Sequence, residues 1–333
     1  MKYYNYKSFI IQGLVEPKLD RQYPFQRIPD QYRESVREEL WNLSQNSAGV
    51  SITFQTNSSK IIAQWKVKLD FKMNHMTDVG IKGLDLYEFK NNNWCYNSTG
   101  LPIGKNTEQV IFNNPKNKLR TFRLHLPLYD TITDLKIGIN DGCDFINMPR
   151  GSESIVFYGT SITQGGCASR PGLGHTNIIS RKTDYNCINL GFSGNGHLES
   201  SIGFILSKIR AKFYIIDCLP NVDIKLIKSN FFPLVKAIRS SSHSIEKPIV
   251  FIEQPNFHNN YYEEDIQEKN NVLAQQIQNA LKLGHHQIYL IKNDNCLGSD
   301  TEATVDGIHY NDIGFQRFAQ HLIKELKKFD ISF

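Results

Sequence analysis

The hydrophobic pattern of this chain changes its period near residue 150, and this change limits the possible folds more than any other feature. Before it, short runs such as 50–56 and 60–67 alternate apolar and polar residues, which is typical of half-buried strands. After it, short apolar runs alternate with helical patterns, the signature of βαβ units and a parallel sheet. We therefore predict an antiparallel β-sandwich or jelly roll over residues 1–150 and a doubly wound α/β domain over 151–333.

The expected elements follow from these two periods. In the first part we expect strands at 50–56, 60–67, 83–89, 121–128 and 135–139, a short strand from Trp94, and a turn or two of helix at 34–41. In the second part we expect strands at 154–158, 187–191, 212–217, 248–253 and 287–291, with helices at 198–209, 224–239, 262–283 and 315–328. Open α/β sheets bind their ligands at the carboxyl ends of such strands, so functional residues are expected there.

Composition excludes several classes of protein. The formal charge of +5 is small for 333 residues, and no basic run is interleaved with aromatic residues, so nucleic acid is not an expected partner. No apolar segment approaches the length of a membrane span, and the amino terminus lacks the apolar core of a signal peptide, so we expect a cytoplasmic protein unless a leader has been removed. Six scattered cysteines without a C-x-x-C pair predict neither a metal site nor a disulfide framework. Oligomeric state is left open, with a homo-oligomer among the options.

A serine follows the first buried strand of the second part. The run 154–159 ends at Gly159 and delivers Thr160 and Ser161, and paired glycines follow at 165 and 166. This position suits a catalytic serine, but it equally suits a helix N-cap at Thr160 or Ser161. Thr163 stands where the G-x-S-x-G elbow requires its second glycine, so the α/β-hydrolase architecture is discounted.

Further motifs fall at the ends of later strands. The glycine-rich loop 191–196 permits backbone N–H groups to approach a ligand, and Asn221 would either cap a helix or donate its amide to an oxyanion. Near the end, Asp306 precedes His309 by three residues, so one turn can present both, with Asp306 holding the tautomer of a basic imidazole. Each motif alone reads equally as a turn or a cap. Their order along the chain would bring all of them to one rim of the sheet.

Taken as an ordered set, these motifs resemble the SGNH hydrolases, also called GDSL-type esterases and lipases. Ser161, Gly194, Asn221 and His309 stand for the four blocks of that family. The first part resembles the companion module named for its G-x-D-L-Y motif, which residues 83–87 spell here, so the resemblance covers nearly the whole chain. It implies a flavodoxin-like sheet. The chain departs from the family in having Thr160 where the family name has Asp, and Leu219 where a Gly is usual.

The resemblance implies acyl transfer to water by a serine esterase. Ser161 would be the nucleophile, His309 its base and Asp306 the residue that orients the base. The oxyanion hole would consist of the backbone N–H groups of Ser161 and Gly194 and the side-chain amide of Asn221. No metal ion or organic cofactor is expected.

The substrate is less constrained. By analogy with carbohydrate deacetylases that join a sandwich to an esterase domain, we expect a small acyl ester, an acetyl group on a saccharide above all. The alternatives are an arylesterase, a thioesterase, a lipase, or a carbohydrate-binding protein without catalysis; the sequence has no long apolar cap segment of the kind a lipase needs. Met73, His75 and Met76 in the loop 71–80, and His197 beside the glycine loop, are expected to line the pocket. The opposite expectation is that the methionines pack in the core and His75 is solvated. The other histidines considered as bases, at 175, 285 and 286, are expected to be solvated or capping residues.

Overall fold

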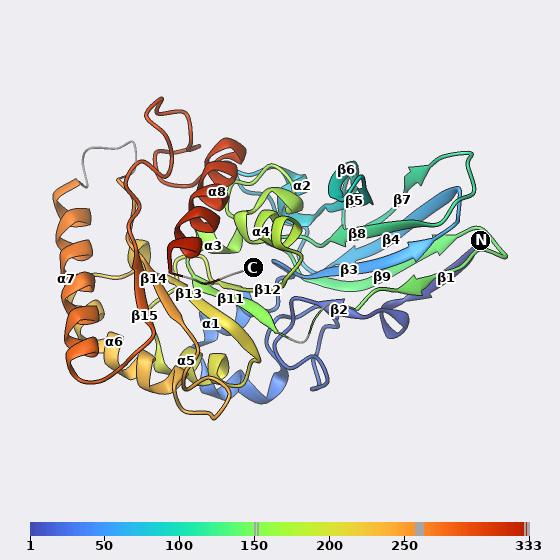
Figure 1. The fold of residues 1–333 in the computed structure, drawn as a ribbon. Coiled ribbons are helices and arrows are strands. Elements are labelled where there is room, and N and C mark those ends of the chain that lie inside the picture. Colours follow the sequence, from blue (N-terminus) through green and yellow to red (C-terminus); the bar gives the residue numbers. More distant parts are fainter. Residues whose placement is uncertain (150, 152, 257–262, 330, 332–333) are drawn as a thin grey trace.

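The computed structural model describes residues 1–149, 151, 153–256, 263–329 and 331 (Figure 1). Two antiparallel sheets occupy the amino-terminal half and confirm the predicted β-sandwich. Their inner faces bury alternate residues such as Ile61, Ala63, Phe54 and Phe122 in one core. The first sheet has the order β1 (Lys2–Asn5), β9 (Ile132–Ile139), β4 (Lys60–Val67), β7 (Asn106–Asn113). The second has the order β10 (Ile146–Asn147), β3 (Ser51–Thr56), β8 (Arg120–His125), β5 (Leu84–Lys90), β6 (Asn93–Gly100), with β2 (Ile11–Gln12) also beside β3.

The second half is built on a five-stranded parallel sheet, as predicted. Its order is β12 (Asn186–Gly191), β11 (Ser154–Gly159), β13 (Ala211–Asp217), β14 (Ile249–Ile252), β15 (Ile288–Ile291). This is the flavodoxin-like order 2-1-3-4-5. The apolar strands bury both faces because helices cover each of them: Val156 and Tyr158 point to one core and Ile155 and Phe157 to the other. The first face carries α5 (Ser200–Ser207), α6 (Ile224–Ile238) and α7 (Glu263–Lys282), and the second carries α4 (His175–Thr183) and α8 (Asp312–Lys328).

Residues of the first 50 positions complete the core of the α/β half. A 3-10 helix (Asp30–Ser35) and α1 (Glu38–Ser44) bury Tyr32, Leu40 and Trp41 against the core that holds α5 and α6 (Figure 1). The predicted turn of helix at 34–41 therefore begins and ends later, and it packs on the parallel sheet. The change of pattern at residue 150 marks where the sheet type changes, while the hydrophobic packing crosses it.

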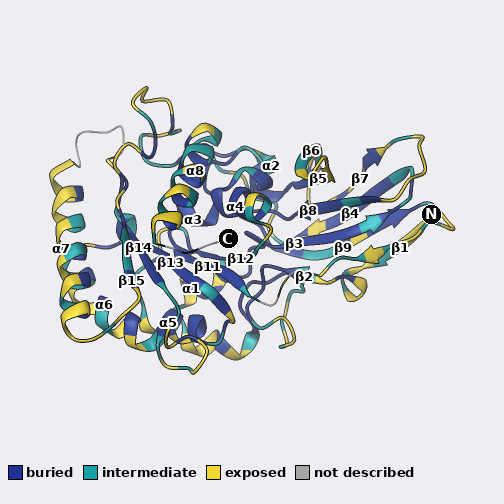
Figure 2. Cartoon of the chain, in the orientation of Figure 1, coloured by how far each residue is buried: buried dark blue, intermediate teal, exposed yellow. Residues whose placement is uncertain are grey.

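Several elements were not expected from the sequence. Helix α4 was missed because polar residues, His175, Thr176 and Asn177, occupy buried positions of its first turn and obscure the helical period. The short helix α2 (Asp78–Lys82) lies inside the segment expected to be a loop. Central strands of both halves, such as β3 and β11, are buried, and the outer faces of α6 and α7 are exposed (Figure 2). Across the described ranges, no helix combines the length and the apolar character that a membrane crossing requires.

Candidate active site

Ser161 begins a short helix directly after β11. Thr160 caps this helix, α3 (Ser161–Gln164), because its hydroxyl accepts a hydrogen bond from the N–H of Ile162 at 3.3 Å. A Cβ on Gly159 would lie 2.1 Å from Oγ1 of Thr163, so only glycine permits the helix to follow the strand this closely. Thr160 therefore takes the capping role, and the hydroxyl of Ser161 is not used for the cap.

The side chains of Ser161, His309 and Asp306 form a continuous chain of hydrogen bonds. Oγ of Ser161 lies 2.9 Å from Nε2 of His309, and Nδ1 of His309 lies 2.7 Å from Oδ2 of Asp306. The other carboxylate oxygen accepts hydrogen bonds from the N–H groups of Ile308 and His309. Burial alone would raise the pKa of the Asp306 carboxyl, but its hydrogen bonds with His309 hold that pKa below its usual value. An ionised Asp306 fixes the tautomer that leaves Nε2 free to accept the serine proton.

The glycine loop lies against the end of β11, and Asn221 contacts it. A Cβ on Gly196 would meet the carbonyl oxygen of Gly159 at 2.5 Å, so the loop packs directly on the strand that precedes Ser161. The N–H of Gly196 donates to Oδ1 of Asn221 at 3.3 Å, which fixes the amide oxygen and leaves Nδ2 as the end that can donate elsewhere. Gly194 is exposed, with a left-handed φ of 67°.

Two other expectations about this region can be compared with the structure. Asn221 does not cap α6, because Asp223 does so by accepting from the N–H of Leu226 at 2.7 Å. His197 is half-buried, and its Nε2 lies 3.1 Å from the carbonyl oxygen of Gly194. It therefore contacts the glycine loop itself.

Two arginines of the first 50 residues brace this loop, and the sequence analysis did not identify them. Arg37 donates to Glu199 at 2.6 Å and to Oδ1 of Asn195 at 2.7 Å. Arg27 is fully buried, and its Nη1 donates to the carbonyl oxygen of Gly191 at 2.7 Å. A signal was present in the sequence, since Arg27 is a lone charge in the otherwise uncharged segment 24–29.

The loop 71–80 brings one of its three predicted residues to His309. The rings of His75 and His309 lie 5.7 Å apart between centroids, and His75 is half-buried. Met76 instead packs in the hydrophobic core at 7% exposure, and Met73 pairs with it across a β-bridge and packs on the same core. The structure therefore favours the core role for the two methionines, because the loop folds back on itself, and leaves His75 beside the site.

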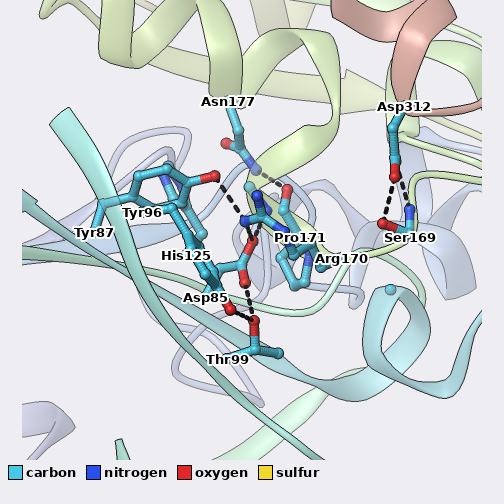
Figure 3. Close-up of polar contacts among 12 residues, drawn as sticks. Asp85, Tyr87, Tyr96, Thr99, His125, Ser169, Arg170, Pro171, Asn177 and Asp312 are labelled. Atoms are coloured by element: carbon cyan, nitrogen blue, oxygen red, sulfur yellow. Dashed lines mark hydrogen bonds and ion pairs between the residues drawn. The ribbon is translucent and has the colours of Figure 1, made fainter. Parts of the chain in front are cut away.

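The G-x-D-L-Y motif holds the loop that follows α3 (Figure 3). Oδ2 of Asp85 accepts from Nη1 of Arg170 at 2.7 Å and from the N–H of Gly172 at 2.8 Å. Ser169, which precedes Arg170, donates through its N–H and its hydroxyl to the two carboxylate oxygens of Asp312, at 2.9 and 2.5 Å. Since Asp312 opens α8 three residues after His309, these contacts link the sandwich to the segment that carries the histidine.

The remaining candidate groups have other roles. His175 is a core residue between Phe315 and Phe318, and burial lowers its pKa to about 3, so the expectation that it is solvated or capping was wrong. Asp217 is buried and accepts a hydrogen bond from Thr163 at 3.2 Å, with its pKa raised by burial to about 6. It does not replace Asp306 as the partner of the imidazole.

One group of side chains carries the donor atoms of a metal site. Ligand atoms of His75, Cys167 and His309 lie within 4.8 Å of one another. Both ring nitrogens of His309 are engaged by Ser161 and Asp306. Burial, and then the charge of Asp306, raise the pKa of the Cys167 thiol to about 12. We therefore assign the group no metal, since its chemistry fits proton transfer better.

Comparisons with known proteins agree with this geometry. A model of the GDSL-like Lipase/Acylhydrolase family matches residues 152–327, and a model described as the "N-terminus of Esterase_SGNH_hydro-type" matches residues 1–145. A crystal structure from Bacteroides ovatus ATCC 8483, described as that of a GDSL-like lipase, has a TM-score of 0.92 and 33% identity over 98% of this chain and 97% of that one.

More distant structures share the fold. A salicylyl-acyltransferase from a tetracycline biosynthetic pathway has a TM-score of 0.79 at 15% identity, covering 97% of this chain and 95% of that one. An acetyl xylan esterase from the rumen bacterium Butyrivibrio proteoclasticus has a TM-score of 0.58 at 12% identity, covering 99% and 100%. The comparison with curated proteins found no match.

Proposed function

We propose that Ser161 is the nucleophile of this chain. The chain belongs to the GDSL-like lipase/acylhydrolase family and is an ester hydrolase. The observation that carries the proposal is the hydrogen-bonded series from Ser161 through His309 to Asp306, with distances of 2.9 and 2.7 Å. A serine hydroxyl needs an adjacent base to attack an ester, and a base needs a third group to orient it. The three side chains supply these roles in that order.

In the proposed reaction, Oγ of Ser161 attacks the acyl carbon while its proton passes to Nε2 of His309. Asp306 stabilises the imidazolium that forms, and the same proton then goes to the leaving alcohol oxygen. Water then attacks the acyl carbon of the acyl-serine while His309 takes its proton. The bond between the acyl carbon and Oγ of Ser161 breaks, the proton returns from His309 to Oγ, and the carboxylic acid is released.

The proposed oxyanion hole consists of the backbone N–H groups of Ser161 and Gly194 and the Nδ2 of Asn221. Two contacts support it: the orientation of the Asn221 amide, whose oxygen is held by Gly196, and the close packing of the glycine loop on Gly159. Donors fixed in advance stabilise the charge that develops in the transition state without reorganisation.

For the substrate, we propose a small acyl ester on a carbohydrate, with acetyl as the first choice. Structures of the same fold include an acetyl xylan esterase and a family two carbohydrate esterase from Clostridium thermocellum in complex with cellohexaose, the latter with a TM-score of 0.61 at 11% identity. His75 is proposed to contact this substrate, because its ring lies beside that of His309. Arylesterase, thioesterase and lipase activities are the alternatives that the same machinery would serve.

The test is a hydrolysis assay on the full chain with short-chain p-nitrophenyl esters, followed by acetylated xylo- and cello-oligosaccharides. Ser161→Ala should abolish turnover and leave thermal unfolding unchanged, because only one hydroxyl is removed. Wild-type turnover in Ser161→Ala would rule out the serine mechanism. Hydrolysis of p-nitrophenyl acetate without release of acetate from any acetylated saccharide would support the nucleophile and contradict the carbohydrate substrate.

A further inference from the structure

A cavity of about 750 Å³ lies between the sandwich and the α/β half, and it shares no lining residue with the active site. Its size falls within the range of small-molecule sites. The turn between β5 and β6 forms one side, and the carboxyl-terminal half of α4 and one face of α8, from Gln316 to Lys327, form the other. Its polar and charged lining includes Tyr87, Arg181, Lys182, Gln316 and Lys327.

Arg181 enters this cavity without a carboxylate partner among the described residues. Its guanidinium stacks on the ring of Tyr87, 3.9 Å from the centroid, and its Nη1 lies 3.2 Å from Nε2 of His125. Burial, followed by the charges of Arg181 and Arg170, holds the pKa of His125 well below its usual value. His125 is therefore neutral, and its Nε2 accepts the hydrogen bond without cancelling the charge of Arg181.

The carboxylate nearest to this cluster is already occupied. Asp85 accepts hydrogen bonds from Arg170, from the N–H of Gly172 and from Thr99 (Figure 3). Arg170 lies 5.7 Å from the centroid of the Tyr87 ring and forms the ion pair with Asp85, so two guanidiniums contact one ring and Arg170 is the one with a direct carboxylate partner. Burial lowers the pKa of Arg181, and Tyr87 and Asp85 partly oppose that effect. Arg181 is half-buried, and the cluster that it forms with Arg170 and Asp85 has one positive charge in excess.

Helix position offers a second explanation for the cations of this cavity. Arg181 and Lys182 lie in the last turn of α4, and Lys327 lies in that of α8, where basic residues complement the helix dipole. The two lysines are exposed and need no ligand. Arg181 differs from them because it is half-buried and its guanidinium is fixed against Tyr87 and His125, which a helix dipole does not require.

We propose that this cavity binds a small oxyanion-bearing ligand, a sugar acid above all, through Arg181. A carboxylate or phosphate group would pair with the guanidinium, which matches planar oxyanions in geometry as well as charge. Lys182 and Lys327 add attraction at the rim. Amide side chains of Asn92, Asn93 and Gln316 line the same cavity and can bind sugar hydroxyls.

The experiment is isothermal titration of the full chain with D-glucuronic acid, inorganic phosphate and D-glucose at low salt. The acid should bind and the neutral sugar should not. Arg181→Met should raise the Kd for the acid at least about tenfold, and Lys182→Ala should raise it less. Lys225→Ala, an exposed lysine on α6, serves as the matched control and should bind as the wild type does. These measurements do not depend on ester hydrolysis.

The melting temperature of the Arg181→Met variant without ligand gives a second test, in which the substitution does not weaken the protein. Replacing a half-buried charge that has no direct ion pair by an apolar side chain should leave the melting temperature unchanged or raise it, while the stabilisation by added acid is lost. Arg181→Lys keeps the charge without the planar fork and should bind with intermediate affinity; it replaces the Met variant if that one does not fold. Binding of inorganic phosphate as well as the acid would support recognition of the oxyanion itself, whether it is a carboxylate or a phosphate. Failure of the acid to bind, equal affinity for glucose, or undiminished binding by the variants would overturn the proposal.

Discussion

Asp85→Asn removes the charge from the carboxylate that joins the sandwich to the loop after α3. Asp85 is fully buried, and it pairs with Arg170, whose side chain is 22% exposed. Removing one partner of a buried ion pair costs about 3–5 kcal/mol. Arg170 is partly hydrated and keeps its contact with the Tyr96 ring at 4.2 Å, so the lower value, about 3 kcal/mol, applies. For a chain of this length that corresponds to a fall in melting temperature of roughly 5 °C.

Activity should change as well, because the same loop reaches the catalytic histidine. Ser169, next to Arg170, is bonded to Asp312, and a Cβ on Gly166 would lie 3.5 Å from Cδ2 of His309. We expect kcat on p-nitrophenyl acetate to fall about tenfold with little change in KM, since displacements below 1 Å already cost rate. The assay pairs thermal unfolding with steady-state kinetics at a temperature where the variant is folded.

Two control variants separate the effect of the Asp85–Arg170 ion pair from that of other changes. Thr99→Val removes one hydrogen bond to the same carboxylate, recorded at 2.9 Å, and should cost about 1 kcal/mol with kcat preserved. Asp134→Asn makes the same chemical change in an exposed pair with Lys136 at 3.8 Å and should change neither quantity measurably. An Asp85→Asn protein with wild-type melting temperature and wild-type kcat would refute the reasoning.

Three further results are expected. Asn221→Ala should lower kcat by about 100- to 1000-fold with an unchanged melting temperature, and a loss below tenfold would remove its amide from the oxyanion hole. His309→Ala should reduce kcat nearly as much as the Ser161→Ala change, and the double variant should be no worse than either, because the two act as a unit; additive losses would contradict that. Asp217→Asn should stabilise the protein at pH 7 by up to about 3 kcal/mol, since the folded carboxyl, with its pKa raised to about 6, binds its proton more tightly than the unfolded one. The free energy of unfolding of the wild type should therefore fall, relative to that of Asp217→Asn, as the pH rises from about 4 to 6. Urea unfolding of both proteins at pH 4 and 7 measures this change. A difference between the two proteins that does not depend on pH would contradict the prediction.

The sequence predicted the elements whose residues are chemically uniform. The short run of β-branched and aromatic residues before Ser161 predicts a buried strand. The order of the motifs after successive strands was enough to place the serine, the glycine loop, the asparagine and the histidine on one rim of the sheet. Helix α4 was missed because His175 is buried in the core, whereas polar residues in a helix usually lie on its exposed face. Side-chain partnerships between distant segments were also missed. Nothing in the local pattern of Arg37 or Arg170 indicates a partner more than 80 residues away.

Arg27 has a consequence for the order in which the chain acquires its structure during synthesis. Its guanidinium donates to a carbonyl group 164 residues further along, at Gly191. At about 5–20 residues per second, the ribosome delivers that acceptor roughly 10 to 30 s after Arg27 has emerged. During this interval the apolar side chains of Tyr32, Leu40 and Trp41, which are buried against the later sheet in the folded protein, have no surface to cover them. The segment that emerges first therefore reaches its native packing among the last, and it is where holdase chaperones are expected to bind the nascent chain.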